Sequence, residues 1–308
     1  MDTPMQVCVT GASGFVGGYV LEALRARGFT VRALVRRAGR LTPRTGLTEV
    51  VGSLDDPASL AAAVAGCGAV VHLVGIIAQQ PGATFTQVHI EGVRNLLAAA
   101  TGAGVRRWVH MSALGTRAHA VAEYHRTKWA GEELVRATAL DWTIFRPSLI
   151  LGPGGEFAHM LKAWSLGTAP PYLFMPFFGA GFWGQSNANG LQPVYAGDVA
   201  EAFTRALVTP ASIGQTYDLG GPEVVTWRQL HAAASLAFRG RHKLTLGIPA
   251  WYARLLLALG LPGLPFNADQ VQMSQEPNCG NRAPLTRDFP DLHLMPLAEI
   301  LRRCAGGQ

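Results

Sequence analysis

The chain has 308 residues, of which 49% are hydrophobic and 15% are charged, and its net charge is +6. This apolar fraction is ample for a buried core and excludes a disordered chain. The four cysteines, Cys8, Cys67, Cys279 and Cys304, have no paired spacing, which argues against a disulfide framework or a zinc site and fits a reducing compartment. The basic residues are scattered without a nucleic-acid-binding motif, so we expect no nucleic-acid partner. His89, His110, His119, His125 and His159 lack a metal-ligand spacing, so we expect no metal.

The N-terminal residues lack the basic region and the apolar run of a signal peptide. No stretch of about 18 apolar residues is free of charges, prolines and glycines, so we expect no transmembrane helix. These features predict a cytoplasmic protein. Association with a membrane stays open as an alternative, because a basic protein can contact an anionic bilayer.

The first half of the chain alternates short apolar runs with helical patterns. Strands are expected at 6–10, 30–35, 47–51, 69–74, 107–112 and 142–146, and helices at 14–27, 58–65, 86–103 and 123–137. Strands that alternate with helices form parallel βαβ units with right-handed crossovers. The pattern therefore predicts an α/β fold with a doubly wound parallel sheet in residues 1–150.

After Pro147 the pattern becomes less regular. A short strand is expected at 192–195, a strand followed by a turn at 217–221, and helices at 198–207 and 226–237. We expect residues 151–308 to form a smaller, mixed C-terminal lobe for a substrate or partner. Segments around 192–208 are expected to return to the core.

Three glycines, Gly11, Gly14 and Gly17, lie between the first expected strand and the first expected helix. Gly11 allows a tight turn, Gly14 allows the backbone to approach a pyrophosphate, and Gly17 allows the helix to pack close to the strand. The helix N-terminus then offers free N–H groups to phosphates. In this position the glycines predict a Rossmann-type dinucleotide site.

Arginines follow the second expected strand. An NAD-preferring site places Asp or Glu here to bond the ribose 2′-hydroxyl, whereas this chain has Arg36 and Arg37. Guanidinium groups pair with a 2′-phosphate that a carboxylate would repel. The sequence therefore favours NADP(H), and NAD(H) stays an alternative.

Tyr124 and Lys128 are four residues apart and share one face of an expected helix. A free tyrosine has a pKa of about 10, and a nearby ammonium would favour its phenolate. Lys128 would also hold ribose hydroxyls of the cofactor. Ser112, at the end of the fifth expected strand, would hydrogen-bond a carbonyl or hydroxyl of the substrate. We expect Tyr124, Lys128 and Ser112 to be the catalytic residues, with Tyr124 and Lys128 also contacting the cofactor.

The combination of the glycine motif Thr10–Gly17, Tyr124 with Lys128, and Arg146-Pro147-Ser148 resembles the short-chain dehydrogenase/reductase superfamily, in its extended or atypical branch. Gln192–Ala200 and Tyr217–Pro222 add to a resemblance that covers residues 5 to 240. Within the superfamily the chain most resembles the bacterial relatives of the NADPH-binding accessory subunit of respiratory complex I.

The resemblance implies further cofactor contacts. These are Ser13, Phe15 and Val16 along the pyrophosphate, Val74, Gly75 and Ile76 beside the adenine ribose, and Pro147 and Ser148 beside the nicotinamide. Many relatives end the third strand with Gly-Asp, whose Asp reaches the adenine amine. Here Gly52 is followed by Ser53 and Leu54, so that contact is weakened or passes to Asp55. Leu54 and Asp55 are both counted among the expected cofactor contacts.

Three functions fit these residues. The first is an NAD(P)H-binding oxidoreductase of short-chain type that acts on a small or lipophilic carbonyl or alcohol. The second is a non-catalytic NADPH-binding protein that supports a respiratory or quinone-related assembly. The third is a nucleotide-sugar epimerase or dehydratase, which is disfavoured because the chain has 113–116 Ala-Leu-Gly-Thr where many sugar-nucleotide members have Tyr-Gly.

Two stretches, 161–183 and 248–266, are rich in aromatic and aliphatic residues, and Arg254 is the only charge in the second. Three interpretations stay open: a site for an isoprenoid or quinone ring, a surface that rests on a membrane, and ordinary core between lobe and sheet. We therefore expect a small, lipophilic substrate, with a peripheral membrane or respiratory-complex contact as a further alternative.

Overall fold

The computed structural model describes residues 5–184, 189–259 and 266–306. The chain forms two compact units. Within the described residues, the first consists of Met1–Pro147, Ala196–Leu219 and Asn281–Leu292. The second consists of Ser148–Tyr195, Gly220–Gly280 and His293–Gln308. Both units are therefore built from segments that are far apart in the sequence.

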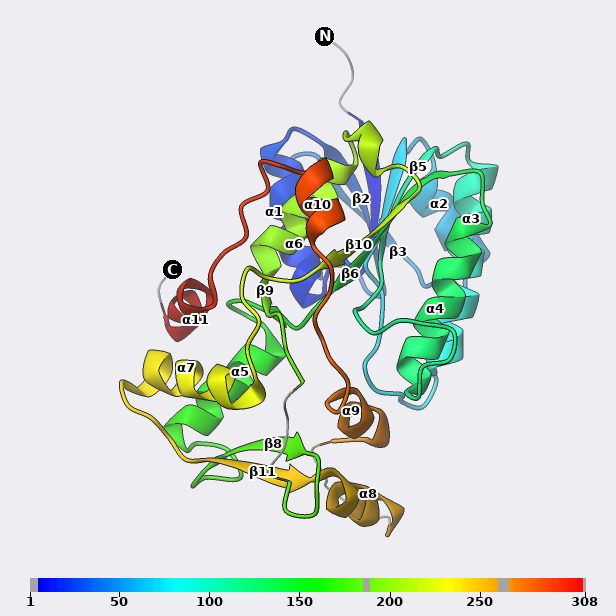
Figure 1. The fold of residues 1–308 in the computed structure, drawn as a ribbon. Coiled ribbons are helices and arrows are strands. Elements are labelled where there is room, and N and C mark those ends of the chain that lie inside the picture. The colour runs from blue at the N-terminus through cyan, green and yellow to red at the C-terminus, as the bar shows by residue number, and fades with distance from the viewer. Residues whose placement is uncertain (1–4, 185–188, 260–265, 307–308) are drawn as a thin grey trace. The chain divides into compact units, whose positions relative to one another are not determined.

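A seven-stranded sheet is the framework of the first unit, and all of its pairings are parallel (Figure 1). In spatial order the strands are β10 Gln215–Leu219, β6 Asp141–Pro147, β5 Arg107–Met111, β4 Ala69–His72, β1 Gln6–Thr10, β2 Thr30–Val35 and β3 Leu47–Val51. The central strand β4 is buried along its whole length, as a parallel strand covered on both faces must be. The predicted doubly wound α/β fold is confirmed.

Helices cover both faces of this sheet (Figure 1). On one side are α1 Phe15–Ala26, α6 Ala196–Ala206 and the short α10 Ala283–Asp288, and on the other are α2 Pro57–Val64, α3 Gly92–Gly102 and α4 Glu123–Arg136. A short 3-10 turn, η2 Pro210–Ser212, follows α6. The core under α2 and α3 centres on Leu60, Leu96 and Trp108, all without exposed surface. Burial of apolar surface between the helices and the sheet is the main contribution to the stability of such a layered fold.

The helix expected over 86–103 differs in its first turn. Residues Gln87–Glu91 form a π-helix, η1, before α3 begins at Gly92. The neighbouring helix α4 comes so close that a Cβ at Gly131 would lie 2.5 Å from the carbonyl oxygen of His89. Apolar periodicity cannot distinguish such a wide turn from an α-helical one, and π-turns occur frequently at functional sites.

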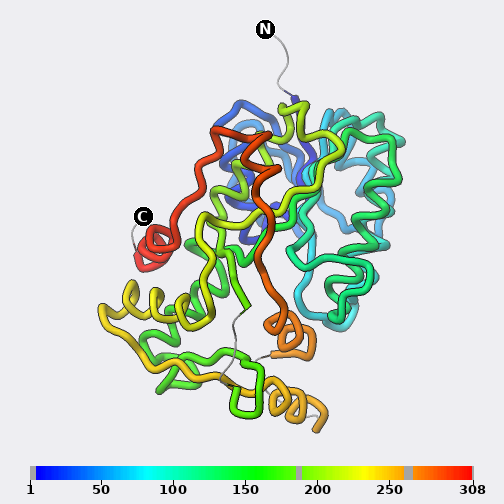
Figure 2. The backbone as a smooth tube through the Cα atoms, in the orientation of Figure 1, coloured from blue at the N-terminus to red at the C-terminus, as the bar shows by residue number. Residues whose placement is uncertain are grey.

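The seventh strand and its cover come from late parts of the chain. The strand expected at 217–221 is β10, and the hydroxyl of Tyr217 donates to Asp288 over 2.7 Å. The ring of Phe289 lies 5.4 Å from that of Tyr217 and 6.1 Å from that of Phe145. Figure 2 shows this late segment, in orange to red, beside β10.

The second unit holds two small parallel sheets. β7 Ile150–Leu151 pairs with β9 Val194–Tyr195, and β8 Met175–Gly179 pairs with β11 Thr245–Pro249. The strand expected at 192–195 is therefore shorter and belongs to a separate sheet. The helices are α5 Glu156–Leu166, α7 Trp227–Arg239, α8 Ala250–Ala258, α9 Ala268–Met273 and α11 Leu297–Ala305. One core lies among α5, α7 and α11, and a smaller one lies between α8, α9 and the β8–β11 ribbon.

No helix within the described ranges is long and apolar enough to cross a bilayer. Over the same residues, no group of three His, Cys, Asp or Glu side chains is placed so that it could hold a metal ion.

Candidate cofactor and active site

The glycine motif forms the turn between β1 and α1. Gly11 has a φ of +77°, and a Cβ there would lie 3.1 Å from the backbone of Leu73 and Val74. The N–H of Gly14 donates to the carbonyl of Gly11 over 3.0 Å, and a Cβ at Gly17 would lie 2.3 Å from the same oxygen. A side chain at Gly17 would therefore push α1 away from the turn.

The N-terminus of α1 is open to a ligand. Gly14 is the N-cap residue and has no side chain to cap the helix. The first N–H groups of a helix have no partner within it, and the helix dipole favours an anion at this end. Ser13 and Phe15 lie on either side of Gly14 at this end of the helix, and their contact with a pyrophosphate stays a prediction.

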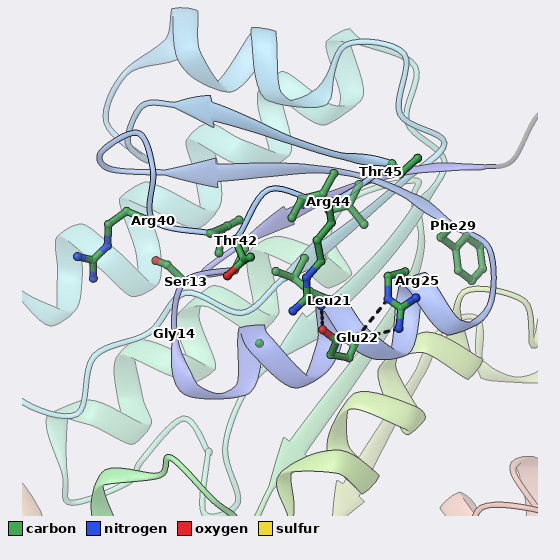
Figure 3. A pocket seen from close by; sticks show the side chains of 16 residues that line it. Ser13, Gly14, Leu21, Glu22, Arg25, Phe29, Arg40, Thr42, Arg44 and Thr45 are labelled. Carbon is green, nitrogen blue, oxygen red and sulfur yellow. Dashed lines mark hydrogen bonds and ion pairs between the residues drawn. The ribbon is translucent and has the colours of Figure 1, made fainter.

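A cavity of about 230 Å³ lies between α1 and the β2–β3 loop. Its walls include Ser13 and Gly14 of the turn, the α1 residues Leu21, Glu22 and Arg25, and residues 40–42 and 44–46 of the loop (Figure 3). Figure 3 shows Arg40, Thr42 and Ser13 at the end of the cavity nearest the helix N-terminus. Sequence analysis did not assign Arg40 or Thr42, although the run of arginines over 36–44 was the signal that could have found them.

Two carboxylates hold the β2–β3 loop. Glu49 accepts the N–H groups of Gly39 and Leu41, both over 2.7 Å, and these bonds lower the pKa of Glu49. Glu22 of α1 forms ion pairs with Arg44 and Arg25. The loop that begins with Arg36 and Arg37 is thus held at Gly39 and Leu41 by hydrogen bonds and at Arg44 by an ion pair. Arg36 and Arg37 themselves are exposed at the end of β2.

Leu54 and Asp55, which are expected near the adenine, lie in different surroundings. Leu54 packs into the core under α2 and α3, and its carbonyl accepts from Asn95 over 2.9 Å. Asp55 is exposed and accepts a short hydrogen bond from the hydroxyl of Ser53, which lowers the pKa of Asp55. The side chain of Leu54 is therefore engaged in the core, whereas the Asp55 carboxylate faces solvent.

Lys128 lies where three elements meet. Its amine donates to the carbonyl of Met111, the residue before Ser112, over 3.0 Å. A Cβ at Gly75, in the segment after β4, would lie 2.9 Å from the same nitrogen. The structure therefore brings Lys128 of α4, the end of β5 and the segment after β4 together. Burial lowers the pKa of Lys128 to about 8, although Glu132 opposes the shift.

Tyr124 lies one turn before Lys128 on α4, with its ring against Phe85, His89 and His125 at centroid distances of 5.9, 5.5 and 5.3 Å. Burial raises the pKa of Tyr124 to about 12, which is opposite to the direction that the Lys128 ammonium was expected to impose. The amine of Lys128 is instead directed at the Met111 carbonyl. In this state the Tyr124 phenol keeps its proton.

Ser112 is buried at the end of β5. Its N–H donates to the carbonyl of Phe145 over 2.7 Å, and its hydroxyl donates to Thr116 over 3.3 Å. Pro147, which ends β6, accepts the N–H of Leu114 over 3.0 Å. The ends of β5 and β6 are thus fixed by backbone hydrogen bonds, and Ser112 is held in one position.

Ser148 begins the second unit. Its hydroxyl donates to the carbonyl of Asn278 over 3.0 Å and contacts the side-chain oxygen of the same residue, and it accepts the N–H of Gln192 over 3.3 Å. These bonds give Ser148 a structural role in the second unit. Its predicted position beside the nicotinamide stays a prediction.

His89 has a structural role at the site that no pattern in the sequence indicates. The N–H of Ile76 donates to Nε2 of His89 over 3.2 Å, so the ring proton is on Nδ1, which faces the hydroxyl of Thr127 at 3.0 Å. Burial lowers the pKa of His89 to about 2, so the ring is neutral. His89 thus joins the segment after β4 to α4, between Tyr124 and Lys128. Because the spacing of His89 from other residues is not that of a metal ligand, its sequence position does not point to a function.

Two more histidines lie beneath this junction. His72 accepts or donates a hydrogen bond with Thr10 over 2.7 Å, and its ring stacks on that of His110 at 5.3 Å. Burial lowers the pKa of His72 to about 3 and that of His110 well below its usual value. Both rings are therefore neutral near pH 7. His72 is a core residue, and within the described part of the chain its Nε2 has no hydrogen-bond partner.

A buried ion pair fixes the helix that carries Tyr124 and Lys128. Arg146 of β6 binds the fully buried carboxylate of Glu132 with two bonds, of 2.8 and 2.6 Å. The guanidinium group of Arg146 also lies over the ring of Trp129, 5.6 Å from its centroid. Fork-shaped pairing of this kind sets orientation as well as distance, so α4 is held in register with β6.

A family model described as NAD(P)H-binding matches residues 11–162. The chain is 32% identical over 233 residues to the mitochondrial NADH dehydrogenase [ubiquinone] 1 alpha subcomplex subunit 9 of Arabidopsis thaliana, with 72% of this chain and 55% of that protein covered. It is 36% identical over 170 residues to a ceramide reductase of Caulobacter vibrioides, with 54% and 52% covered. The chain thus spans about half the length of the curated relatives it matches.

A solved structure of a short-chain dehydrogenase/reductase superfamily protein from Agrobacterium tumefaciens, with bound NAD, is 25% identical to the chain. The TM-score is 0.62, and the match covers 88% of this chain and 95% of the other. The chain contains an NAD(P)H-binding domain. Its relatives and this solved structure are consistent with a member of the extended short-chain dehydrogenase/reductase superfamily.

Proposed function

We propose that this protein is an NADP(H)-dependent oxidoreductase that acts on a small or lipophilic carbonyl or alcohol. The observation that carries the proposal is the junction at Lys128, where the end of β5, the segment after β4 and helix α4 meet. It belongs to the same unit as the glycine turn and lies at the C-terminal ends of parallel strands, where doubly wound sheets bind their ligands.

Each residue has a distinct role in this proposal. The nicotinamide, when bound, supplies or accepts a hydride. The phenol of Tyr124 keeps its proton in this environment and donates it to the substrate oxygen during reduction. The hydroxyl of Ser112 orients that oxygen by a hydrogen bond. Lys128, close to both strand ends, holds ribose hydroxyls and restores the proton of Tyr124 through them.

The protein with NADPH and a panel of lipophilic ketones, aldehydes and quinones tests this function. We expect at least one compound to be reduced, with loss of the absorbance of the reduced nicotinamide. Tyr124→Phe is expected to lower kcat by roughly 10²–10⁴-fold while NADPH still binds, because only the proton donor is lost. Equal turnover by Tyr124→Phe and the wild type would contradict the role of Tyr124.

The preference for NADP(H) rests on the β2–β3 loop. Arg36 and Arg37 follow β2 where an NAD site has a carboxylate, and Arg40 lines the adjacent cavity. In titrations with both cofactors we expect tighter binding of NADPH than of NADH, and Arg36→Ala should narrow the difference. Equal affinity of the wild type for NADPH and NADH would contradict the proposed preference for NADP(H).

A second function is favoured by one comparison. The chain is similar to a subunit of NADH dehydrogenase. A protein that binds NADPH without turnover and supports a respiratory or quinone-related assembly fits this likeness. In cells that need the protein, Gly14→Asp would then abolish its function while Tyr124→Phe would not. If both variants fail equally, the catalytic proposal stands.

A further inference from the structure

Helix α8 of the second unit has its large apolar residues on the outside. It buries the small side chains of Ala250 and Ala253 against the β8–β11 ribbon and α9. Its exposed side has Trp251, Tyr252, Leu255 and the adjoining Leu259, with exposed fractions of 43–64%. Trp251, Leu255 and Leu259 are spaced by four residues, so they form one stripe. A helix that exposes its large apolar side chains and buries alanines lacks part of its apolar cover.

The stripe continues onto the ribbon. Side chains alternate along a strand, so Leu246 and Ile248 point to the same face of β11, together with Phe178 of β8 across the pairing. Leu244 directly precedes the strand. Ile248 and Phe178 are covered by the small core under α8, whereas Leu244 and Leu246 are exposed. Figure 1 shows α8 following β11 at the end of the ribbon. We call the exposed residues Leu244, Leu246, Trp251, Tyr252, Leu255 and Leu259 the α8 patch.

The sequence around the α8 patch has no negative charge. Residues 224–268 contain no Asp or Glu, but they contain the cations Arg228, Arg239, Arg241, Lys243 and Arg254. Arg241 is exposed directly before the patch begins, and Arg254 is exposed on α8 itself. The amine of Lys243 donates to the carbonyl of Tyr172 over 2.7 Å, close to the exposed Leu173. The exposed apolar residues thus lie in a stretch of sequence whose charged side chains are all basic, and the nearest acidic residue along the chain is Asp269 of α9.

The basic residues near the α8 patch favour one of two surfaces that could cover it, a second copy of the chain or a lipid bilayer. A symmetric dimer through it would bring the same cations of two copies together, and like charges across an interface weaken association. An anionic bilayer offers the opposite charge and an apolar interior. Trp and Tyr favour the level of the lipid headgroups, and basic residues beside them are attracted to anionic lipids.

We propose that the α8 patch docks this protein on the surface of an anionic lipid bilayer, with α8 lying in the interface. The docking is peripheral: the stripe enters the boundary between headgroups and acyl chains, and Arg239, Arg241 and Arg254 contact anionic headgroups. The proposal goes beyond the oxidoreductase function and does not depend on turnover. It would place the protein where lipophilic substrates are dissolved.

Flotation with vesicles of phosphatidylcholine, with or without phosphatidylglycerol, tests the docking. We expect the wild type to float with vesicles that contain phosphatidylglycerol and to float less at high salt, because salt screens the attraction. The double variant Leu255→Gln/Leu259→Gln keeps helix-forming residues and should lower binding by roughly tenfold or more. The matched control is Val208→Gln, an exposed valine of the first unit, which should float like the wild type.

A charge variant separates the two contributions. Each cation near an anionic surface contributes about fivefold to binding, so Arg239→Gln/Arg241→Gln should weaken binding to phosphatidylglycerol vesicles by roughly 25-fold. Binding to pure phosphatidylcholine should change little. Arg94→Gln, at an exposed position of α3, is the control. Brominated lipids should also quench the fluorescence of Trp251, and Trp251→Phe should reduce that quenching.

Three results would overturn the proposal. The first is a wild type that floats with neither kind of vesicle. The second is a Leu255→Gln/Leu259→Gln variant that is folded, by circular dichroism, and floats like the wild type. The third is a wild type that self-associates without lipid and becomes a monomer in that variant, which would assign the patch to a second copy. NADPH binding in solution, measured on the same samples, tests the cofactor site independently of all three.

Discussion

The β2–β3 loop and the junction at Lys128 belong to the same unit but are held by different forces. The loop is exposed, and the carboxylates of Glu49 and Glu22 hold it from the surface. The junction is buried, and neutral groups such as His89, Thr127 and the Met111 carbonyl fix its geometry. Charge–charge contacts at a surface are weakened by salt, whereas buried hydrogen bonds are not.

This difference has a functional meaning. Selectivity for a 2′-phosphate needs only positive charge in a roughly correct place, which a surface loop can provide. Proton transfer needs fixed distances and shifted pKa values, which require burial. Changes in the loop should therefore act on cofactor preference and depend on salt, and changes at the junction should be larger and independent of salt.

The largest effect is expected at Gly17, because the glycine turn supports both regions. In Gly17→Ala the new Cβ would lie 2.3 Å from the Gly11 carbonyl oxygen and 2.5 Å from that of Ala12. We expect NADPH binding to be lost in fluorescence titrations and stability to fall by about 3 kcal/mol. Gly18→Ala is the matched control, since a Cβ there has nothing within 4 Å. A Gly17→Ala variant that binds normally would contradict the close approach.

The next largest effect is the pH dependence of stability that the buried amine of Lys128 causes. The pKa of Lys128 is lowered to about 8 in the folded protein, so between pH 8 and its ordinary value the unfolded chain binds more protons. The contribution of Lys128 to stability therefore rises with pH in that range. Between pH 7 and 9.5, the wild type should gain about 2 kcal/mol relative to Lys128→Met in urea unfolding. A constant difference between the two proteins would show an ordinary pKa for Lys128.

His89 should have a moderate effect. His89→Ala leaves the N–H of Ile76 without its acceptor and separates the segment after β4 from α4. We expect NADPH binding to weaken about tenfold, which corresponds to the loss of about one buried hydrogen bond. The effect should persist at high salt. His89→Gln, whose amide oxygen can accept from the N–H of Ile76, should restore part of the affinity. If His89→Ala binds NADPH like the wild type and His89→Gln does not differ from it, His89 serves only in packing.

The smallest effect is expected at Glu49. Glu49→Gln replaces a carboxylate that accepts the N–H groups of Gly39 and Leu41, so the loop that contains Arg36 becomes less ordered. We expect NADPH affinity to fall by about threefold and NADH affinity to stay unchanged, as measured by titration of both cofactors. High salt should reduce this difference. A change that is equal for both cofactors and unaffected by salt would contradict the contrast between the two regions.

Much of the first unit could be predicted from the sequence, since buried strands appear as short apolar runs between glycines and prolines. The starts of β1, β2 and β3 agree with the sequence to the residue because turns bound them. The π-turn η1 could not be predicted, because it depends on the approach of α4 at Gly131. The partners of His89 come from segments that are distant in the sequence, so no local pattern reveals its role. The pairing of β8 with β11 joins segments 70 residues apart, and local periodicity has no information on it.

The segment Asn281–Leu292 completes the first unit, which has a consequence for synthesis of the chain. Tyr217 finds its partner Asp288 only when nearly the whole chain has been made, and until then the rings of Phe145 and Tyr217 lack the cover of Phe289. A chain that stops before this segment leaves the last strand of the sheet partly uncovered. The nucleotide-binding half is therefore not a separable N-terminal module, and its final folding step follows the emergence of residue 292 from the ribosome.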